Sequence, residues 1–298
     1  MRAILVHTIY VLCAMLLLGN ASGLAMQTNV SLLSLVPQKS DIIVEVAPLQ
    51  KAGQPRYFVL FTLANRIDYE DFLAVAAVDP TLRLDRMIFT ATNGATKATA
   101  EHSLIAGGHF DADRIRGRVS SNQGLLDYRG VPICVVPPLG RESSYFQQDR
   151  LLAILGSDLA LFGTPDSIRV EIDRLLDGAV VDTLITQKVG LLNRKVDSWY
   201  LVHSPSQSAS FAELLGTLDS KLGDIVQANE LLFGLRYGKR VEFEYATRSI
   251  LPARAGSDRQ QGAKSMLGKE GTETEAVVKI VRIERGRFGK WLELHKGL

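Results

Sequence analysis

Apolar residues recur at strand and helix spacing along most of the chain. Residues 41–48 open with an acid, continue with β-branched side chains and end at a proline, which predicts a strand. Helical spacing of apolar residues over 68–79, ended by an Asp-Pro pair, predicts a helix. Two further strands are expected at 84–90 and 102–110. The first part of the chain therefore follows the order strand, helix, strand, strand.

The same succession returns in the second half of the chain. Residues 197–205 repeat the acid start, the apolar middle and the proline end of the first strand. A capping box and one continuous apolar stripe predict a helix over 210–225. Strands are expected at 229–235 and 240–245. On this alignment two pairs of residues take comparable places: Val46 with Val202, and Phe89 with Phe233.

The repeated succession predicts an α+β fold with two related sheet-and-helix halves after an N-terminal signal segment. The first copy continues with a helix and a strand, which favours a ferredoxin-like sheet. With 298 residues and 46% hydrophobic content, the chain has room for two cores. The expected parts are a signal peptide (1–25), a first α+β domain (34–182), a second α+β unit (190–248), a flexible loop (249–276) and a basic β-hairpin packed on the second unit (277–298).

Turn and cap chemistry is clear at three places between the two copies. Asp111 is placed to cap a helix, Arg129-Gly130 is expected to turn a hairpin, and Thr164-Pro165-Asp166 is typical of a helix start. With a Val-Pro before the first strand and Gly-His-Phe-Asp before a helix, this pattern resembles uncharacterised exported proteins of bacteria over residues 34 to about 245. The resemblance implies a periplasmic or envelope-associated α+β protein with no assigned reaction.

The first 25 residues have the features of a secretory signal peptide. Arg2 precedes an almost uninterrupted apolar run from Ile4 to Leu18, and small residues follow up to Ala25. The run is shorter than the roughly 20 residues that a membrane-spanning helix needs. We therefore expect an exported protein, periplasmic or extracellular, with no membrane span after cleavage. Tethering by an uncleaved N-terminal segment is the alternative.

Positive charge is concentrated near the C-terminus. The overall net charge is only +2, which gives no reason to expect nucleic-acid binding. From Arg236 to the end, however, 14 Lys and Arg stand against 8 Asp and Glu. Basic and aromatic side chains together are suited to an anionic polymer or lipid surface. The residues expected to form such a surface are Lys279, Arg282, Arg285, Arg287, Phe288, Lys290 and Trp291.

No sequence motif indicates catalysis, a cofactor or a metal ion. The Gly-x-Ser-x-Gly pattern of α/β hydrolases does not occur. His109 and Asp111 share a strand spacing suitable for a metal ion but lack a third ligand, so neither a metal site nor a cofactor is expected. Glu242 and Glu244 alternate with apolar residues, which indicates a solvated sheet face rather than a catalytic pair.

Three hypotheses follow. The preferred one is a non-catalytic envelope protein that binds a protein partner or an anionic polymer or lipid surface through its C-terminal basic segment. A hydrolase-type enzyme with a cleft between the halves is the first alternative, and His109, Asp111 and Glu101 are its first candidates. The other is a structural assembly module whose strand edges pair with another chain.

Overall fold

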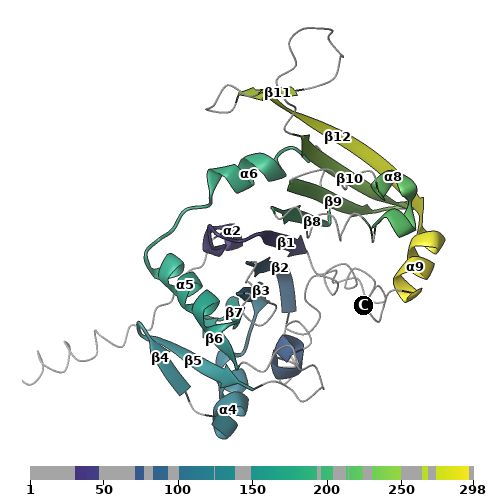
Figure 1. The fold of residues 1–298 in the computed structure, drawn as a ribbon. Helices are drawn as coiled ribbons and strands as arrows, with labels where there is room; N and C mark the ends of the chain where they lie inside the picture. The colour runs from purple at the N-terminus through teal and green to yellow at the C-terminus, as the bar shows by residue number, and fades with distance from the viewer. Residues whose placement is uncertain are drawn as a thin grey trace, which may run out of the picture.

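The computed structural model shows a mixed α+β fold built on one antiparallel sheet (Figure 1). It describes residues 31–46, 71–76, 83–92, 101–123, 125–137, 149–192, 196–203, 213, 215–223, 230–249, 264–267 and 273–294. The predicted signal peptide lies outside the described residues. Within them, no helix has the length and apolar character needed to cross a membrane.

Twelve strands form the sheet. They are β1 (Ile42–Val46), β2 (Arg83–Ala91), β3 (His102–His109), β4 (Leu125–Tyr128), β5 (Val131–Val136), β6 (Arg150–Leu155), β7 (Leu159–Gly163), β8 (Ser198–Val202), β9 (Glu230–Tyr237), β10 (Arg240–Ser249), β11 (Lys264–Leu267) and β12 (Glu273–Glu284). Their order across the sheet is β11, β12, β10, β9, β8, β1, β2, β3, β7, β6, β5, β4. Every neighbouring pair is antiparallel.

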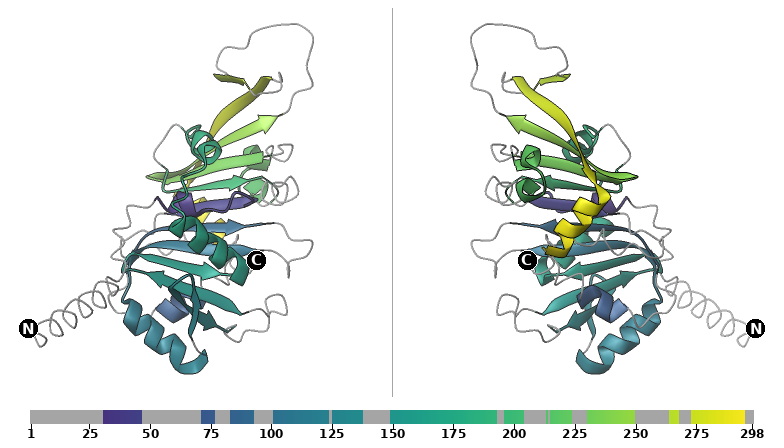
Figure 2. Two further views of the ribbon diagram at one scale, coloured as in Figure 1. Left: turned by 90° about the vertical axis from the view of Figure 1, so that its left-hand side faces the viewer. Right: turned by 90° about the vertical axis from the view of Figure 1, so that its right-hand side faces the viewer.

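Helices cover both faces of the sheet. They are α2 (Leu32–Leu35), α4 (Ala112–Gln123), α5 (Pro165–Leu176), α6 (Thr183–Val189), α8 (Ser220–Gly223) and α9 (Arg285–Leu294), with helical turns at 71–76 and 215–218. Figure 2 shows α5 and α6 in front of one face and α8 and α9 in front of the other.

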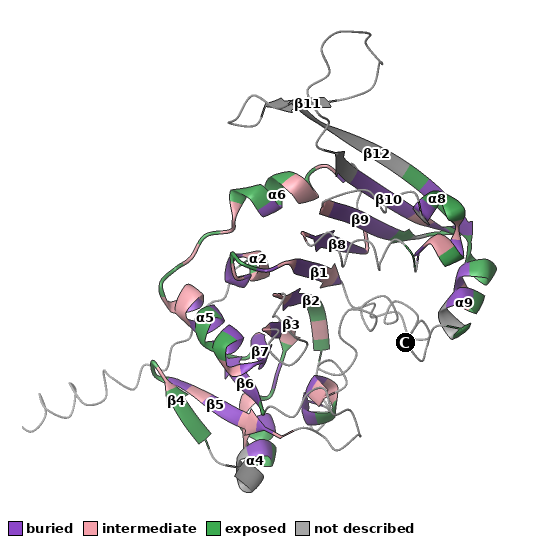
Figure 3. Cartoon of the chain, viewed as in Figure 1, coloured by how far each residue is buried: buried purple, intermediate pink, exposed green. Residues whose placement is uncertain are grey.

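Alternation along the strands divides the apolar residues between two cores. On β1, Val44 belongs to the core under α4, α8 and α9, whereas Ile43 belongs to the core under α2, α5 and α6. The central strands are buried on both sides (Figure 3). A strand covered on both faces reads as a continuous apolar run, and β6 and β8 have this pattern.

The two predicted domains share this single sheet, because β1 pairs with β8. The runs β1, β2, β3 and β8, β9, β10 each pair in consecutive order. Phe89 lies across from Val44, and Phe233 lies across from Tyr200. A split β-α-β arrangement places another strand between two parallel ones. Since β1 and β2 are antiparallel neighbours, the described strands do not form the ferredoxin-like topology.

The helix start and the hairpin turn expected in the middle of the chain lie where predicted. Arg129 and Gly130 have φ values of 55° and 81° between β4 and β5, as a tight hairpin turn requires. Arg129 also forms ion pairs of 2.8 Å with Asp173 and 2.9 Å with Asp177, both on or next to α5. Pro165 begins α5, but the Thr164 side chain makes no cap hydrogen bond and donates to Glu101 instead.

The C-terminal prediction was wrong in two respects. Residues 285–294 form helix α9 rather than a turn and a returning strand, so the 277–298 segment is not a β-hairpin. Phe288 and Trp291 are three residues apart and both buried, which fits one helical face. The predicted loop at 249–276 contains β11 and the beginning of β12.

Gly234 on β9 lies under the segment that follows α6. An added Cβ would lie 2.6 Å from Val196 Cγ1 and 3.2 Å from Leu192 Cδ1. We expect Gly234→Ala to lower the free energy of unfolding by about 1–3 kcal/mol, because the segment must shift to make room. Urea unfolding measures this loss. Gly238→Ala, where the nearest atom is 3.6 Å away, is the control, and equal losses in both variants would contradict the prediction.

Candidate functional site

The ends of three neighbouring strands, β9, β10 and β12, meet at one end of the sheet. Strand β10 lies between β9 and β12, and its first residue, Arg240, pairs with the last residue of β12, Glu284. The turn at 238–239 and the start of α9 therefore lie at the same strand ends. Seven exposed cationic residues belong to this region, which we call the basic end: Arg236, Lys239, Arg240, Arg282, Arg285, Arg287 and Lys290.

Only part of the charge at the basic end is balanced by carboxylates. Ion pairs join Arg240 to Glu284 at 2.8 Å, Arg282 to Glu242 at 2.8 Å, and Arg287 to Asp219 at 3.8 Å. The other four cations have no ion pair within the part of the chain that the structure describes. These four are Arg236, Lys239, Arg285 and Lys290. The basic end therefore carries an excess of exposed positive charge.

The first of two hollows at the basic end lies on the strands. It measures about 380 Å³, and the β-ladder brings Arg236, Glu242 and Arg282 side by side in it. Lys239 and Arg240 complete the cationic lining, with Gly238 at the turn. Four cations therefore surround a single carboxylate in this hollow, which we call the strand hollow.

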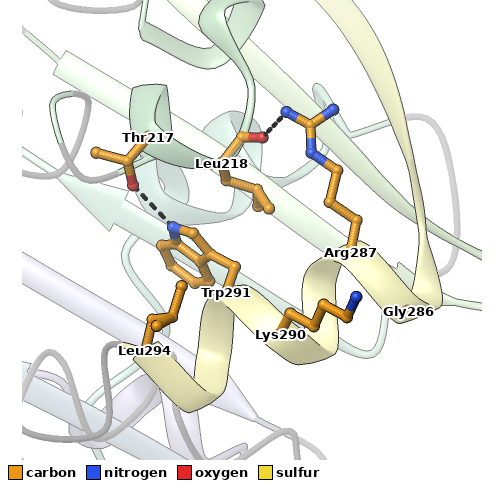
Figure 4. Close-up of a pocket in the computed structure, with 7 residues that line it drawn as sticks. All are labelled: Thr217, Leu218, Gly286, Arg287, Lys290, Trp291 and Leu294. Carbon is orange, nitrogen blue, oxygen red and sulfur yellow. Dashed lines mark hydrogen bonds between the residues drawn. The ribbon is translucent and has the colours of Figure 1, made fainter.

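The second hollow, the α9 pocket, lies between α9 and the helical turn at 215–218 (Figure 4). It measures about 520 Å³. Its lining consists of Thr217, Leu218, Gly286, Arg287, Lys290, Trp291 and Leu294. Two hydrogen bonds hold the walls together: Trp291 Nε1 donates to Thr217 Oγ1 at 2.8 Å, and Arg287 Nη2 donates to the Leu218 carbonyl.

The structure separates the residues predicted for an anionic surface into two groups. Arg282, Arg285, Arg287 and Lys290 are exposed at the basic end. Phe288 and Trp291 are core residues instead, 2% and 5% exposed. Their rings stack at 5.9 Å, and Phe288 packs edge-on against Phe243 of β10 at 5.7 Å, which fixes α9 to the sheet. Lys279 lies on β12, but its side chain is outside the described part of the structure.

Sequence reasoning missed the three cations of the β9–β10 region, Arg236, Lys239 and Arg240. The strands on either side were predicted, at 229–235 and 240–245, but the position of the segment between them beside α9 depends on the pairing of β10 with β12. The spacing of charges within the segment Arg-Tyr-Gly-Lys-Arg was the available signal. Glu244 also differs from the prediction, because it is 3% exposed rather than part of a solvated face.

The candidates for an enzymatic site do not come together. Glu101 precedes β3 and His109 ends it, so a strand of 8 residues, roughly 26 Å long, separates them. Asp111 caps α4 by accepting a hydrogen bond of 3.0 Å from the Arg114 amide. Among the described residues, no three His, Cys, Asp or Glu side chains are grouped as metal ligands would be.

A row of buried polar side chains lies between α5 and the sheet, closed to solvent. Glu171 and Ser103 are both 0% exposed, and the Ser103 hydroxyl donates to Glu171 Oε1. Burial raises the pKa of the Glu171 carboxyl to about 8, although the hydrogen bond from Ser103 acts in the opposite direction. Thr90 extends the row with a hydroxyl contact of 2.9 Å to Ser103. A substrate has no access to these groups in this arrangement.

A charged cluster fastens α6 to the sheet. Glu230 Oε2 lies 2.6 Å from Lys188 Nζ and 2.9 Å from His203 Nδ1. Burial alone raises the pKa of Glu230, but the hydrogen bonds from His203 and Lys188 outweigh it and hold the pKa below its usual value. The cluster joins α6, β8 and β9, which accounts for its geometry without a ligand.

The chain matches no protein-family model, no curated protein and no solved structure.

Proposed function

We propose that the protein is a non-catalytic, exported envelope protein that holds an anionic surface at its basic end. One observation carries the proposal: seven exposed cations from two stretches of the chain, 236–240 and 282–290, gather at one end of the sheet, where three carboxylates of the described residues pair with only three of them. Clustered positive charge raises the local concentration of anionic partners and speeds their association.

The distribution of charge along the chain supports a dedicated surface. The overall net charge is +2, yet residues 236–298 hold 14 cationic against 8 acidic side chains. The excess is therefore confined to the part of the chain that forms the basic end. An ordinary solubilising surface instead intersperses both signs.

The proposal includes a duplicated strand-helix-strand-strand unit, of which the second copy carries the binding surface. Consecutive pairing in both three-strand runs supports the relation between the halves. The segment 236–240, which contains the turn between β9 and β10, reads Arg-Tyr-Gly-Lys-Arg, whereas the connection between β2 and β3 has a single Lys over 92–101. Export is supported by the apolar N-terminal segment and the small residues that follow it.

The test is binding to vesicles that contain phosphatidylglycerol, compared with vesicles of phosphatidylcholine alone. We expect binding to the anionic vesicles only, and a steep loss of it between about 0.1 M and about 0.5 M salt. Arg236→Glu with Lys239→Glu is expected to weaken binding by about 2 kcal/mol or more, roughly 30-fold, since each cation near an anionic surface contributes about 1 kcal/mol. Co-sedimentation measures the bound fraction.

The matched control reverses two exposed cations elsewhere, Lys39→Glu with Arg114→Glu, so that the net charge changes equally. We expect this pair to retain most of the binding. Vesicle binding that is insensitive to salt, or lost equally in both double variants, would contradict a surface located at the basic end.

A further inference from the structure

The walls of the α9 pocket expose mainly carbon. The indole N–H of Trp291 is already bonded to Thr217, and the Arg287 guanidinium is bonded to the Leu218 carbonyl (Figure 4). The Trp291 ring, the Leu218 side chain and the Leu294 side chain supply the apolar part of the lining, beside Gly286 and Lys290. Because these hydrogen-bonding groups are paired, the open walls favour an apolar group over a polar one.

The rim of the pocket is cationic. Lys290 is exposed and has no ion pair within the described residues, while Arg287 is partly offset by Asp219 at 3.8 Å. Counting only the side chains that the structure describes, one positive charge therefore remains without a carboxylate beside the apolar walls. A ligand that complements both features carries one negative charge at the end of an apolar chain.

We propose that the α9 pocket binds an alkyl chain that bears a single anionic head group, with the chain against Trp291, Leu218 and Leu294 and the head group at Lys290. The inference rests on the proposed function in one respect, namely that the basic end faces an anionic, lipid-containing surface. The volume of about 520 Å³ lies within the range of ligand pockets, about 300–1,000 Å³. Each methylene group buried there contributes about 0.8 kcal/mol.

Other ligands match the pocket less well. A small inorganic anion would meet the charge of Lys290 but leave the apolar walls in water. An uncharged chain would cover the walls but leave the ammonium group beside it without a counter-charge. Both a free fatty acid and an anionic lipid within a bilayer have an alkyl chain and an anionic head group. The experiment below separates these two sources.

Calorimetric titration of the full chain with decanoate tests the proposal, with inorganic phosphate and decyltrimethylammonium as comparison ligands. We expect decanoate alone to bind. Gly286→Phe fills the pocket and keeps every charge, since an added Cβ at Gly286 meets nothing within 4 Å. It is expected to weaken decanoate binding at least about tenfold, which corresponds to lost contact with roughly two methylene groups. Lys290→Gln should weaken it as well.

The matched control is Gly117→Phe on α4, where an added Cβ also meets nothing within 4 Å. It should leave decanoate binding as it is. Equal binding of decyltrimethylammonium, no binding of decanoate, or full binding by Gly286→Phe would overturn the proposal.

The vesicle assay distinguishes this inference from the proposed function. If anionic vesicles bind in a salt-dependent way but decanoate does not, the pocket proposal falls and the basic end stands. If decanoate binds and vesicles do not, the pocket proposal stands and the proposed binding of an anionic surface falls. When both bind, a loss of vesicle binding in Gly286→Phe identifies a bilayer lipid as the ligand, and retained vesicle binding identifies a free acid.

Discussion

Replacing Glu171 by glutamine is expected to flatten the dependence of stability on pH. Glu171 lies on the face of α5 that packs against the sheet and is 0% exposed. Burial raises the pKa of its carboxyl from 4.5 to about 8. Between these two values the folded protein keeps a proton that the unfolded chain releases. The stability that the protonated Glu171 carboxyl contributes is therefore fully present below pH 4.5 and is lost as the pH rises through about 8. Glutamine cannot ionise and has no such loss.

The size of the effect is a few kcal/mol across this window, because one pKa unit corresponds to about 1.4 kcal/mol. The glutamine side chain would also bury an amide nitrogen in place of Glu171 Oε2, which accepts no hydrogen bond from the described residues. That cost, about 1–3 kcal/mol, is the same at every pH, so the slope is the informative quantity.

Urea unfolding of both proteins from about pH 5 to about pH 9 measures that slope. Glu284→Gln, at an exposed carboxyl on the basic end, is the control and should follow the parent curve. Parallel curves for Glu171→Gln and the parent protein would show that Glu171 does not titrate in this range.

Truncation of Phe233 is expected to cause the second large effect, a loss of about 3–5 kcal/mol of stability in Phe233→Ala. Phe233 is 1% exposed, and its ring stacks on Tyr200 with centroids 4.3 Å apart and planes 5° from parallel. The pair joins β8 to β9 next to the junction with β1. A stacked pair contributes about 0.5–1.5 kcal/mol beyond its buried area.

A double-mutant cycle with Tyr200→Leu and Phe233→Leu isolates the stacking energy, because leucine keeps most of the apolar volume. We expect a coupling of about 0.5–1.5 kcal/mol in urea unfolding. Since one sheet runs through both halves, a single transition is also expected. A coupling near zero, or separate transitions for the two halves, would argue against a shared core.

Local patterns predicted most of the strands but not how they associate. Residues 41–48, 197–205 and 229–235 correspond to β1, β8 and β9, because their apolar content is a property of each segment. The pairing of β1 with β8 joins segments about 150 residues apart, and nothing in either segment specifies its partner. The ferredoxin-like prediction failed for this reason.

At the candidate site, too, local features were predicted from the sequence and the association of distant segments was not. Arg285, Arg287 and Lys290 are exposed, as a binding surface for anions requires, and the surface itself stays a prediction. Phe288 was misassigned because its basic neighbours obscured a helical spacing to Trp291, and both rings belong to the core. Arg236, two residues before the turn at 238–239, became part of the site only through strand pairing.

The central place of β1 affects how the protein is made. On a growing chain, β1 emerges long before β8, so the strand edge that carries Ile42, Val44 and Val46 stays open during synthesis. Until β8 arrives, the same edge can recruit β1 of another chain, which favours misassembly over folding. The competition ends once β8 has been synthesised and occupies that edge.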